Sequence, residues 1–343
     1  MNIYALSSGR GPSGIAIVRI SGKDTLKICK NLTKLKTINS NEVNYCKFYD
    51  PKNDKVIDPE ALLLWFPKPN SYTGDDLAEF QVHGSNAVIN ALLKALSEQD
   101  NCRLAEPGEF TKIAFQNNKI NLLKAESIAD LISSETEIQR QQAIKIMSGA
   151  SSDKFNSWRQ GLLKILSNVE AKIDFSDEDL PDNLLKNIKA KSETIKSEIK
   201  KTLNDQKVGE RIREGFRIAI VGPTNAGKSS LLNYLSRREV AIVSEIAGTT
   251  RDVIETHLNI EGLPVVVSDT AGIRKSKNEI EKKGIRLALK RAEDADLNIV
   301  VIEPKSGYFT AFLKDLISSK SILVINKSDM GINNMVQEFK KYN

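Results

Sequence analysis

The chain has 343 residues, of which 40% are hydrophobic and 27% charged, so it is long enough for two or three globular domains. No apolar run approaches the length of a membrane span, and the first ten residues lack the regions of a signal peptide. The formal net charge of +6 favours an anionic partner. A cytoplasmic protein is therefore expected.

The cysteines and histidines show no site pattern. Cys29, Cys46 and Cys102 have neither metal-binding nor redox spacing, which predicts small core residues in a reducing cytosol. His83 and His257 are far apart in the sequence and are interpreted as structural. The candidate sites must therefore come from other residues.

Residues 1–118 predict a mixed α/β domain. Apolar patterns indicate strands over 14–20, 61–66 and 76–82, and helical spacing indicates a helix over 85–97. Arg19 and Glu79 stand inside two of these strands. Either they line a small-molecule pocket, with Arg for a carboxylate and Glu for ring N–H groups, or they face solvent. The residues alone favour solvent.

Residues 119–213 predict a helical domain. Apolar stripes near 128–132 and along 162–173 and 188–203 indicate long amphipathic helices in an antiparallel bundle, with the stripes in its core. The segment 183–214 has nine Lys or Arg against five Asp or Glu, which fits either a solvated helix face or contact with RNA. Residues 208–215 are predicted to form a short charged linker.

The last segment, 214–343, contains Gly222-Pro-Thr-Asn-Ala-Gly-Lys-Ser-Ser230, which matches G-x-x-x-x-G-K-[ST] between an apolar strand, 216–221, and a helical pattern. Gly222 and Gly227 let the backbone curl so that several N–H groups point at one anion, and the helix N-terminus adds a positive dipole end. Lys228 is predicted to reach the β- and γ-phosphates, and Ser229 to bind Mg²⁺.

Three further motifs follow in the order of a GTP-binding domain. Asp269-Thr-Ala-Gly272 follows an apolar run, and Asp269 can hold Mg²⁺ through water. Asn326-Lys-Ser-Asp329 ends another apolar strand, and its Asp can accept both N–H groups of a guanine edge. Gly248-Thr-Thr-Arg-Asp252 lies between the phosphate loop and Asp269, where a Thr can complete the Mg²⁺ shell only while the γ-phosphate is present. Together these motifs predict a P-loop GTPase domain.

The residue that activates the attacking water in this domain must differ from the one used by many small GTPases. Ile273 follows Gly272 and cannot orient water as the Gln found there in many small GTPases does. Glu279 and Glu281 are both candidates, since a carboxylate can accept a hydrogen bond from water. Asn225 either ligates a monovalent cation through its amide oxygen or caps its own turn.

The whole chain resembles the MnmE (TrmE) family of bacterial and organellar tRNA-modification GTPases. Besides the phosphate loop, the resemblance rests on the segments 14–22 (GIAIVRISG), 66–74 (FPKPNSYTG), 83–84 (HG), 107–110 (PGEF), 125–126 (AE) and 129–130 (AD). It implies a multidomain protein of α/β and α classes, with a folate-binding N-terminal domain that forms the homodimer and a helical domain that carries the GTPase domain.

The resemblance also implies cofactors and partners. GTP hydrolysis would require Mg²⁺ and be activated by K⁺, which drives the pairing of two GTPase domains. The protein would work with the flavoprotein MnmG, in a complex of heterotetramer type, in carboxymethylaminomethyl modification of the tRNA wobble uridine. The one-carbon unit would come from 5-formyl- or methylene-tetrahydrofolate.

Single residues receive roles from the same resemblance. Arg19, Glu79 and Lys119 match folate-binding positions, which reverses the solvent interpretation of the first two. Ser229 and Thr250 match Mg²⁺ ligands, and Asn225, Thr249 and the backbone of Ser244 and Ile246 match K⁺ ligands. Glu281, rather than Glu279, matches the catalytic glutamate. The GTP-binding set is Asn225, Ala226, Gly227, Lys228, Ser229, Ser230, Ser244, Glu245, Ile246, Ala247, Gly248, Thr249, Thr250, Asp269, Thr270, Ala271, Gly272, Asn326, Lys327, Ser328 and Asp329.

The sequence ends 14 residues after Asp329. A complete GTPase domain needs a further strand and helix, so a GTPase domain incomplete at its C-terminus is expected, with weakened guanine binding. Two alternatives follow. One is a non-catalytic folate-binding dimerisation module. The other is a ribosome-assembly GTPase, against which the first 118 residues argue.

Overall fold

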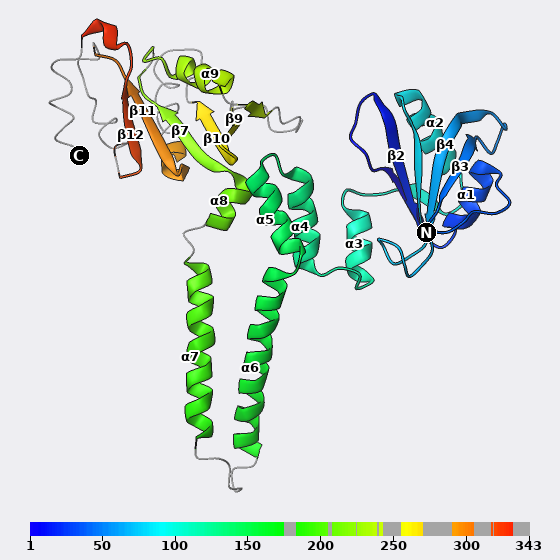
Figure 1. Cartoon of the computed structure of the whole chain (residues 1–343), viewed down its shortest axis with the longest axis horizontal. Coiled ribbons are helices and arrows are strands. Elements are labelled where there is room, and N and C mark those ends of the chain that lie inside the picture. The colour runs from blue at the N-terminus through cyan, green and yellow to red at the C-terminus, as the bar shows by residue number, and fades with distance from the viewer. Residues whose placement is uncertain are drawn as a thin grey trace. The chain divides into compact units, whose positions relative to one another are not determined.

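The computed structural model describes residues 1–174, 183–204, 208–223, 225–238, 240–242, 255–269, 290–304, 317 and 319–331 (Figure 1). The chain divides into two compact units, Met1–Glu126 and Ser127–Asn343. The division falls within the helix α4 (Leu122–Ser133). The domain boundaries predicted at 118 and 213 stay predictions.

The first unit is built on a six-stranded sheet with the strand order β3-β4-β5-β2-β1-β6. All neighbouring pairs are antiparallel except β1 with β6. The strands are β1 (Asn2–Leu6), β2 (Ser13–Ser21), β3 (Val43–Tyr49), β4 (Val56–Phe66), β5 (Leu77–Gly84) and β6 (Cys102–Leu104). The helices are α1 (Thr25–Thr33), α2 (Asn86–Ser97) and α3 (Glu109–Gln116).

Alternation along the strands sends one side of the sheet into the core. Val18, Ile20, Phe80 and Val82 are buried in a cluster that includes apolar residues of α1 and α2. Arg19, between two core residues of β2, therefore points to the opposite face. This explains how a charged residue interrupts an apolar run without disturbing the core.

An ion pair holds the start of α3. Arg103 of β6 binds the carboxylate of Glu109, with 2.8 Å between Nη1 and Oε2, and the backbone N–H of Glu106 donates to the same oxygen at 2.8 Å. The Arg103 guanidinium lowers the pKa of Glu109 to about 2. The carboxylate also lies in the first turn of α3, where the helix dipole favours negative charge.

The second unit begins with helices. These are α4, α5 (Glu137–Met147), α6 (Ala150–Asp174), α7 (Leu184–Leu203) and α8 (Val208–Glu214). Thr136 and Gln139 form a capping box at the start of α5. The helices α6 and α7 lie side by side as an antiparallel hairpin (Figure 1).

The described strands of the second unit form a six-stranded sheet with the order β12-β11-β7-β10-β9-β8. They are β7 (Phe216–Val221), β8 (Val240–Ile242), β9 (Glu255–Ile260), β10 (Leu263–Asp269), β11 (Leu297–Ile302) and β12 (Ser321–Ile325). The helix α9 (Lys228–Arg238) follows β7, and a short 3-10 helix spans Ser328–Met330. Ala219, Ile220 and Val221 of β7 are all buried, as expected of a central strand covered on both faces.

The predicted fold class, a mixed α/β unit with helices and a P-loop sheet, is confirmed. The helical interpretation needs two corrections. Residues 208–214, predicted as a linker, form α8. The apolar stripe of α6, predicted as core, is exposed, since Leu162, Leu166 and Ile173 are 50%, 52% and 69% exposed.

Cysteines and histidines are structural in the described residues. Cys29 and Cys46 are buried in the core of the first unit and Cys102 packs against it, as predicted. Burial raises the pKa of the Cys46 thiol to about 11. His83 lies 3.0 Å from the buried carboxylate of Asp58. No helix among the described residues is long and apolar enough to cross a membrane.

Glu109→Gln should lower the free energy of unfolding of the first unit by about 2 kcal/mol at pH 7, because hydrogen bonds to a charged group contribute about 1.5–3 kcal/mol. The folded-state pKa of Glu109 is lowered, so its contribution is complete above the unfolded-state value near 4.5 and is lost as the pH falls toward 2. Urea unfolding of a Trp158→Phe chain, with Trp65 of β4 as the fluorescent reporter, measures the loss of stability at pH 7 and its dependence on pH.

The control is Glu106→Gln, an exposed neighbour whose carboxylate acts on Arg103 only through a weak coulombic interaction. It should leave stability within about 0.5 kcal/mol, as surface substitutions usually do. A loss for Glu109→Gln that is the same at pH 7 and pH 3 would contradict the role of its charge.

Candidate functional site

The carboxyl ends of the parallel strands of the second sheet meet at one edge. β10, β7, β11 and β12 are neighbours, with Asp269 opposite Ile220 and Ile302 opposite Ile325. Loops that leave these ends therefore converge, although their sequences are far apart. In open sheets of this kind ligands bind outside the carboxyl ends of the strands.

The loop after β7 approaches its neighbours so closely that two glycines are required. Gly222 has a φ of +150°, and a Cβ there would overlap the carbonyl oxygen of Val301. Gly227 has a φ of +98°, and a Cβ there would overlap the side-chain amide of Asn326. The glycines of the motif thus serve local packing as well as backbone curvature.

Lys228 begins α9 and lies over this loop. Its side chain is almost fully buried, and Nζ donates to the carbonyl oxygens of Gly222 at 2.9 Å and Pro223 at 2.7 Å. The loop therefore combines a helix N-terminus with an ammonium group. This is the donor set that phosphate oxygens need.

The hydroxyls of Ser229 and Ser230 follow in the first turn of α9, in exposed residues. Hydroxyl oxygens are hard ligands of the kind that Mg²⁺ takes together with phosphate oxygens. The role of Ser229 as a Mg²⁺ ligand stays a prediction.

The loop after β12 is bonded to the phosphate loop. Asn326 donates through Nδ2 to the carbonyl oxygen of Ala226 at 2.8 Å. Lys327 donates through Nζ to the carbonyl oxygen of Asn225 at 2.8 Å and pairs with Glu303 at 2.5 Å. Two of the predicted motifs, about 100 residues apart, are thereby brought into contact.

Asn225 and Asp329 present polar side chains at this edge. Asn225 is exposed, with a φ of +64°, and no described residue forms a hydrogen bond with its side-chain amide. Asn capping its own turn is therefore not what the described contacts show. Asp329 is exposed in the 3-10 helix that follows Lys327.

Other predicted residues lie outside the described residues: Ser244, Glu245, Ile246, Ala247, Gly248, Thr249, Thr250, Thr270, Ala271, Gly272 and Glu281. Asp269 is the last residue of β10, at the converging edge. Ser328 is exposed beside Asp329.

A second candidate site lies in the first unit. Arg19 and Glu79 are opposite each other on β2 and β5, and Nη2 of Arg19 lies 2.7 Å from Oε1 of Glu79. The guanidinium carbon of Arg19 is 5.5 Å from the ring centre of Tyr72 and 5.6 Å from that of Phe110. The pair is half-buried, so it combines charge with two aromatic rings within cation–π range.

Lys119 is linked to this site through the loop 67–76. Its Nζ donates to the carbonyl oxygen of Pro69 at 3.0 Å. The side-chain amide of Asn117 donates to the backbone carbonyl oxygen of Thr73 at 2.8 Å. Gly74, with a φ of +83°, lets the loop pass close to both side chains. The loop that carries Tyr72 under Arg19 is thus fixed by residues at the end of α3.

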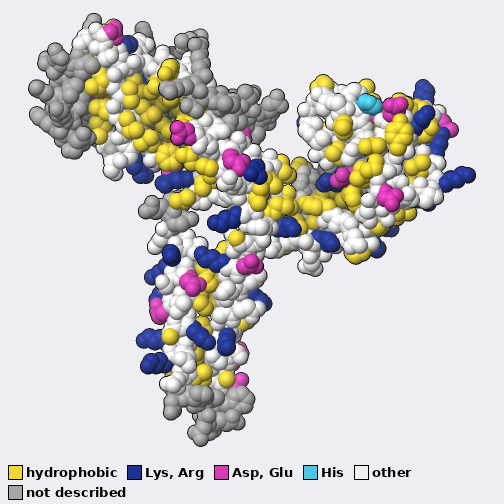
Figure 2. All heavy atoms as spheres, in the orientation of Figure 1, with side chains coloured by type: hydrophobic (Ala, Val, Ile, Leu, Met, Phe, Trp, Pro, Cys, Tyr) yellow, Lys and Arg dark blue, Asp and Glu magenta, His cyan; other side chains and the backbone are white. Residues whose placement is uncertain are grey.

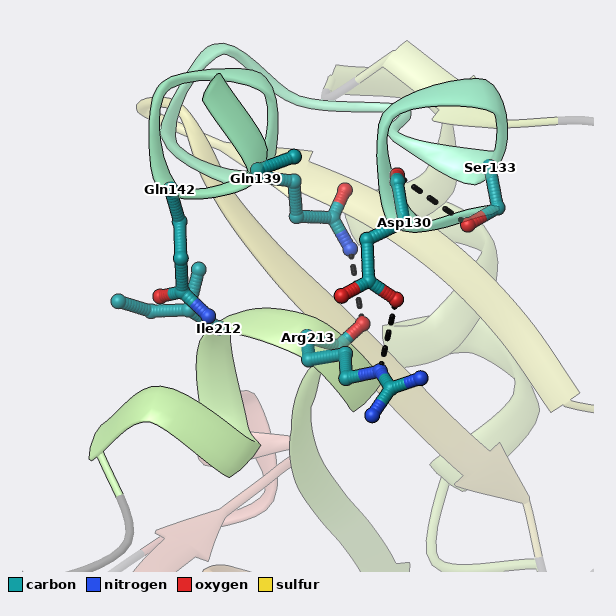
Figure 3. A pocket seen from close by; sticks show the side chains of 7 residues that line it. Asp130, Ser133, Gln139, Gln142, Ile212 and Arg213 are labelled. Carbon is teal, nitrogen blue, oxygen red and sulfur yellow. Dashed lines mark hydrogen bonds and ion pairs between the residues drawn. The ribbon is translucent and has the colours of Figure 1, made fainter. Parts of the chain in front are cut away.

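A polar cluster that the sequence analysis missed joins α4, α5 and α8 around a small pocket (Figure 3). Arg213 of α8 pairs with Asp130 of α4 at 2.8 Å. Gln139 and Gln142 of α5 donate to the carbonyl oxygens of Arg213 at 3.2 Å and Gly209 at 3.0 Å. The four charged residues in 208–214, two acidic and two basic, were the sequence signal for this contact.

The other end of α8 holds the phosphate strand. Asp296 accepts from Arg211 at 2.8 Å and from the backbone N–H of Arg217 at 3.1 Å. Gly215, between α8 and β7, has a φ of +92°. The helix α8 is therefore fixed both to the other helices and to the beginning of the strand that leads to the phosphate loop.

The comparisons with known proteins agree along the chain. Residues 2–119 match the family model "GTP-binding protein TrmE N-terminus", and residues 122–340 match "MnmE helical domain". The tRNA modification GTPase MnmE of Pelagibacter ubique is 66% identical over 342 residues, covering 100% of this chain and 77% of that protein.

More distant relatives give the same result. The tRNA modification GTPase MnmE of Rickettsia bellii is 46% identical, covering 96% of this chain and 74% of that protein. A solved structure of Era from Aquifex aeolicus with bound GDP and AlF₄⁻ is 32% identical to this chain. The match covers 36% of this chain and 46% of the Era chain, with a TM-score of 0.28. On the family models and the relatives, this chain belongs to the MnmE (TrmE) family of tRNA modification GTPases.

Proposed function

We propose that the chain binds and hydrolyses GTP in a Mg²⁺-dependent, K⁺-activated reaction that serves modification of cytoplasmic tRNA. The observation that carries this proposal is the contact between the phosphate loop and the Asn326–Asp329 loop. It places a phosphate-binding donor set beside a carboxylate suited to a guanine edge. The family relationship supplies the tRNA.

K⁺ activation is supported by the side chain of Asn225. Its amide oxygen is exposed in the phosphate loop and unbonded among the described residues. A monovalent cation held there would supply positive charge between the β- and γ-phosphates as the bond to the γ-phosphate breaks. Thr249 and the backbone of Ser244 and Ile246 are proposed to complete this shell, and Ser229 and Thr250 to bind Mg²⁺.

Folate binding is supported by the Arg19–Glu79 pair. A reduced pterin ring offers adjacent N–H groups to a carboxylate and a flat face to aromatic rings, and Tyr72 and Phe110 lie beside the guanidinium. Lys119 is proposed as the third folate-binding residue. 5-Formyl- or methylene-tetrahydrofolate would provide the one-carbon unit, in a homodimer formed by this unit and with the flavoprotein MnmG acting on the wobble uridine.

GTP turnover in KCl should exceed turnover in NaCl at matched ionic strength by tenfold or more. Asn225→Ala should lower the KCl rate to the NaCl rate with GTP affinity within about threefold, because it removes a cation ligand rather than a phosphate donor. Asn233→Ala, at an exposed position further along α9, is the control and should keep the stimulation. Equal rates in the two salts, with GTP bound, would contradict the proposed activation.

Glu281→Ala should lower turnover at least a hundredfold, as loss of a general base typically does, while GTP affinity stays within a few-fold. Glu279→Ala is the matched control, two residues away, and should keep most of the activity. Single-turnover hydrolysis and nucleotide titration measure the two quantities. A collapse of GTP affinity in Glu281→Ala would make this residue structural instead.

Glu79→Gln should weaken binding of 5-formyl-tetrahydrofolate at least tenfold, because an amide cannot accept two charge-assisted hydrogen bonds or hold the Arg19 guanidinium in place. Calorimetric titration of the full chain measures the affinity. Glu60→Gln, an exposed carboxylate of β4, is the control and should bind as the parent does. Unchanged folate binding in Glu79→Gln would remove this site from the proposal.

A further inference from the structure

The helix α7 carries two different faces. Successive residues turn by about 100°, so positions 186, 189, 193, 196 and 200 share one arc of about 80°. Four of these five positions are lysine: Lys186, Lys189, Lys196 and Lys200. All four lysines are exposed, and Glu193, which lies among them, pairs with Lys196 at 3.1 Å.

This lysine stripe, defined by residues 186, 189, 196 and 200, points away from α6. The contacts with α6 come from the other side of α7: Glu198 accepts from Trp158 at 2.7 Å, and Thr202 accepts from Lys154 at 2.6 Å. At about 100° per residue, positions 198 and 202 lie roughly 120–180° around the helix from the four lysines of the stripe. Packing of the hairpin therefore leaves the stripe facing outward.

Within the described residues only one lysine of the stripe is paired, Lys196 with Glu193, so most of its positive charge is not neutralised. Lys186, Lys189 and Lys200 have no ion pair or hydrogen bond from their side chains to any described residue. Figure 2 shows dark blue side chains gathered along the α7 side of the hairpin. A row of cations over 14 residues of helix extends about 21 Å, long enough to follow several phosphates of a nucleic acid backbone.

We propose that the lysine stripe of α7 is a docking surface for the backbone of tRNA. This inference rests on the proposed function, in which tRNA is the substrate, and it adds the surface that meets it. Lysines on a regular helix, without interleaved aromatic residues in the arc, suit phosphates rather than bases. The stripe would hold and orient tRNA without reading its sequence.

The experiment measures the affinity of the full chain for an unmodified tRNA transcript by fluorescence anisotropy at several KCl concentrations. The test variant is Lys189→Glu with Lys200→Glu. The matched control is Lys191→Glu with Lys201→Glu, which makes the same change of net charge on the same helix but outside the arc. Circular dichroism checks that both variants keep their helices.

The test variant should bind tRNA about tenfold more weakly at 0.1 M KCl, and its slope of log affinity against log salt should be shallower by about 1.5, as expected for two lost phosphate contacts. The control should stay within about threefold of the parent. Equal weakening of both variants, or no weakening of either, would overturn the proposal. So would an equal effect on binding of polyglutamate, which would indicate an acidic protein partner instead.

GTP turnover of the same preparations separates this inference from the proposed function. If turnover is stimulated by K⁺ and both variants bind tRNA with equal affinity, the docking role of the lysine stripe is contradicted but the proposed GTPase function is not. Absence of turnover in the parent chain would defeat the proposed GTPase, while the tRNA comparison would still decide the stripe.

Discussion

The hydrogen bond from the Asn326 side chain to the carbonyl oxygen of Ala226 joins the two loops that are proposed to recognise GTP. It requires an approach so close that position 227 cannot carry a Cβ. The phosphate loop is therefore shaped partly by the residue that precedes the predicted guanine contacts. A change at either loop should affect the other, because the half-buried amide of Asn326 would lose its partner.

The amino end of β7, like its carboxyl end, is bonded to other parts of the second unit. Asp296 binds α8 and the first residues of β7, while Arg213 and the glutamines of α5 bind α8 to the other helices. The strand that ends in the phosphate loop thus begins at a helix clamped on two sides. Hydrogen bonds and ion pairs therefore run without a break from the beginning of β7 through α8 to α4 and α5.

The regular elements of the sheets could be predicted from sequence, whereas their connections could not. The strand 216–221 was predicted with its observed limits, because a central strand must be apolar throughout. α8 was predicted as a linker, since its seven residues have no apolar periodicity and its helix depends on Arg211 and Arg213 finding distant carboxylates. Periodicity likewise found α6 but could not show that its stripe is exposed, because exposure depends on what packs against it.

The residues of the candidate site also fall into those that the sequence could predict and those that only the structure shows. Motif spacing predicted Lys228 and Asn326 as site residues. Glu303 and Tyr72 were identified only from the structure. Glu303 follows an apolar strand, as Asp269 ends one, and could have been found by that signal. Arg19 and Glu79 were left between two interpretations by the residues alone. Only the register of β2 and β5 shows that each is the other's partner.

That register also places the proposed folate site beside a face that could take part in the proposed dimer. Antiparallel partners share a face, and the cross-strand row through Arg19 and Glu79 continues to Leu64 and Val43. Val43 is 61% exposed and Tyr45, two residues on, is 65% exposed, so the face beside the ion pair is apolar and open to solvent. If the proposed homodimer covers this face, ligand binding at the Arg19–Glu79 pair and association of two chains are linked, so that each changes the affinity of the other by the same factor.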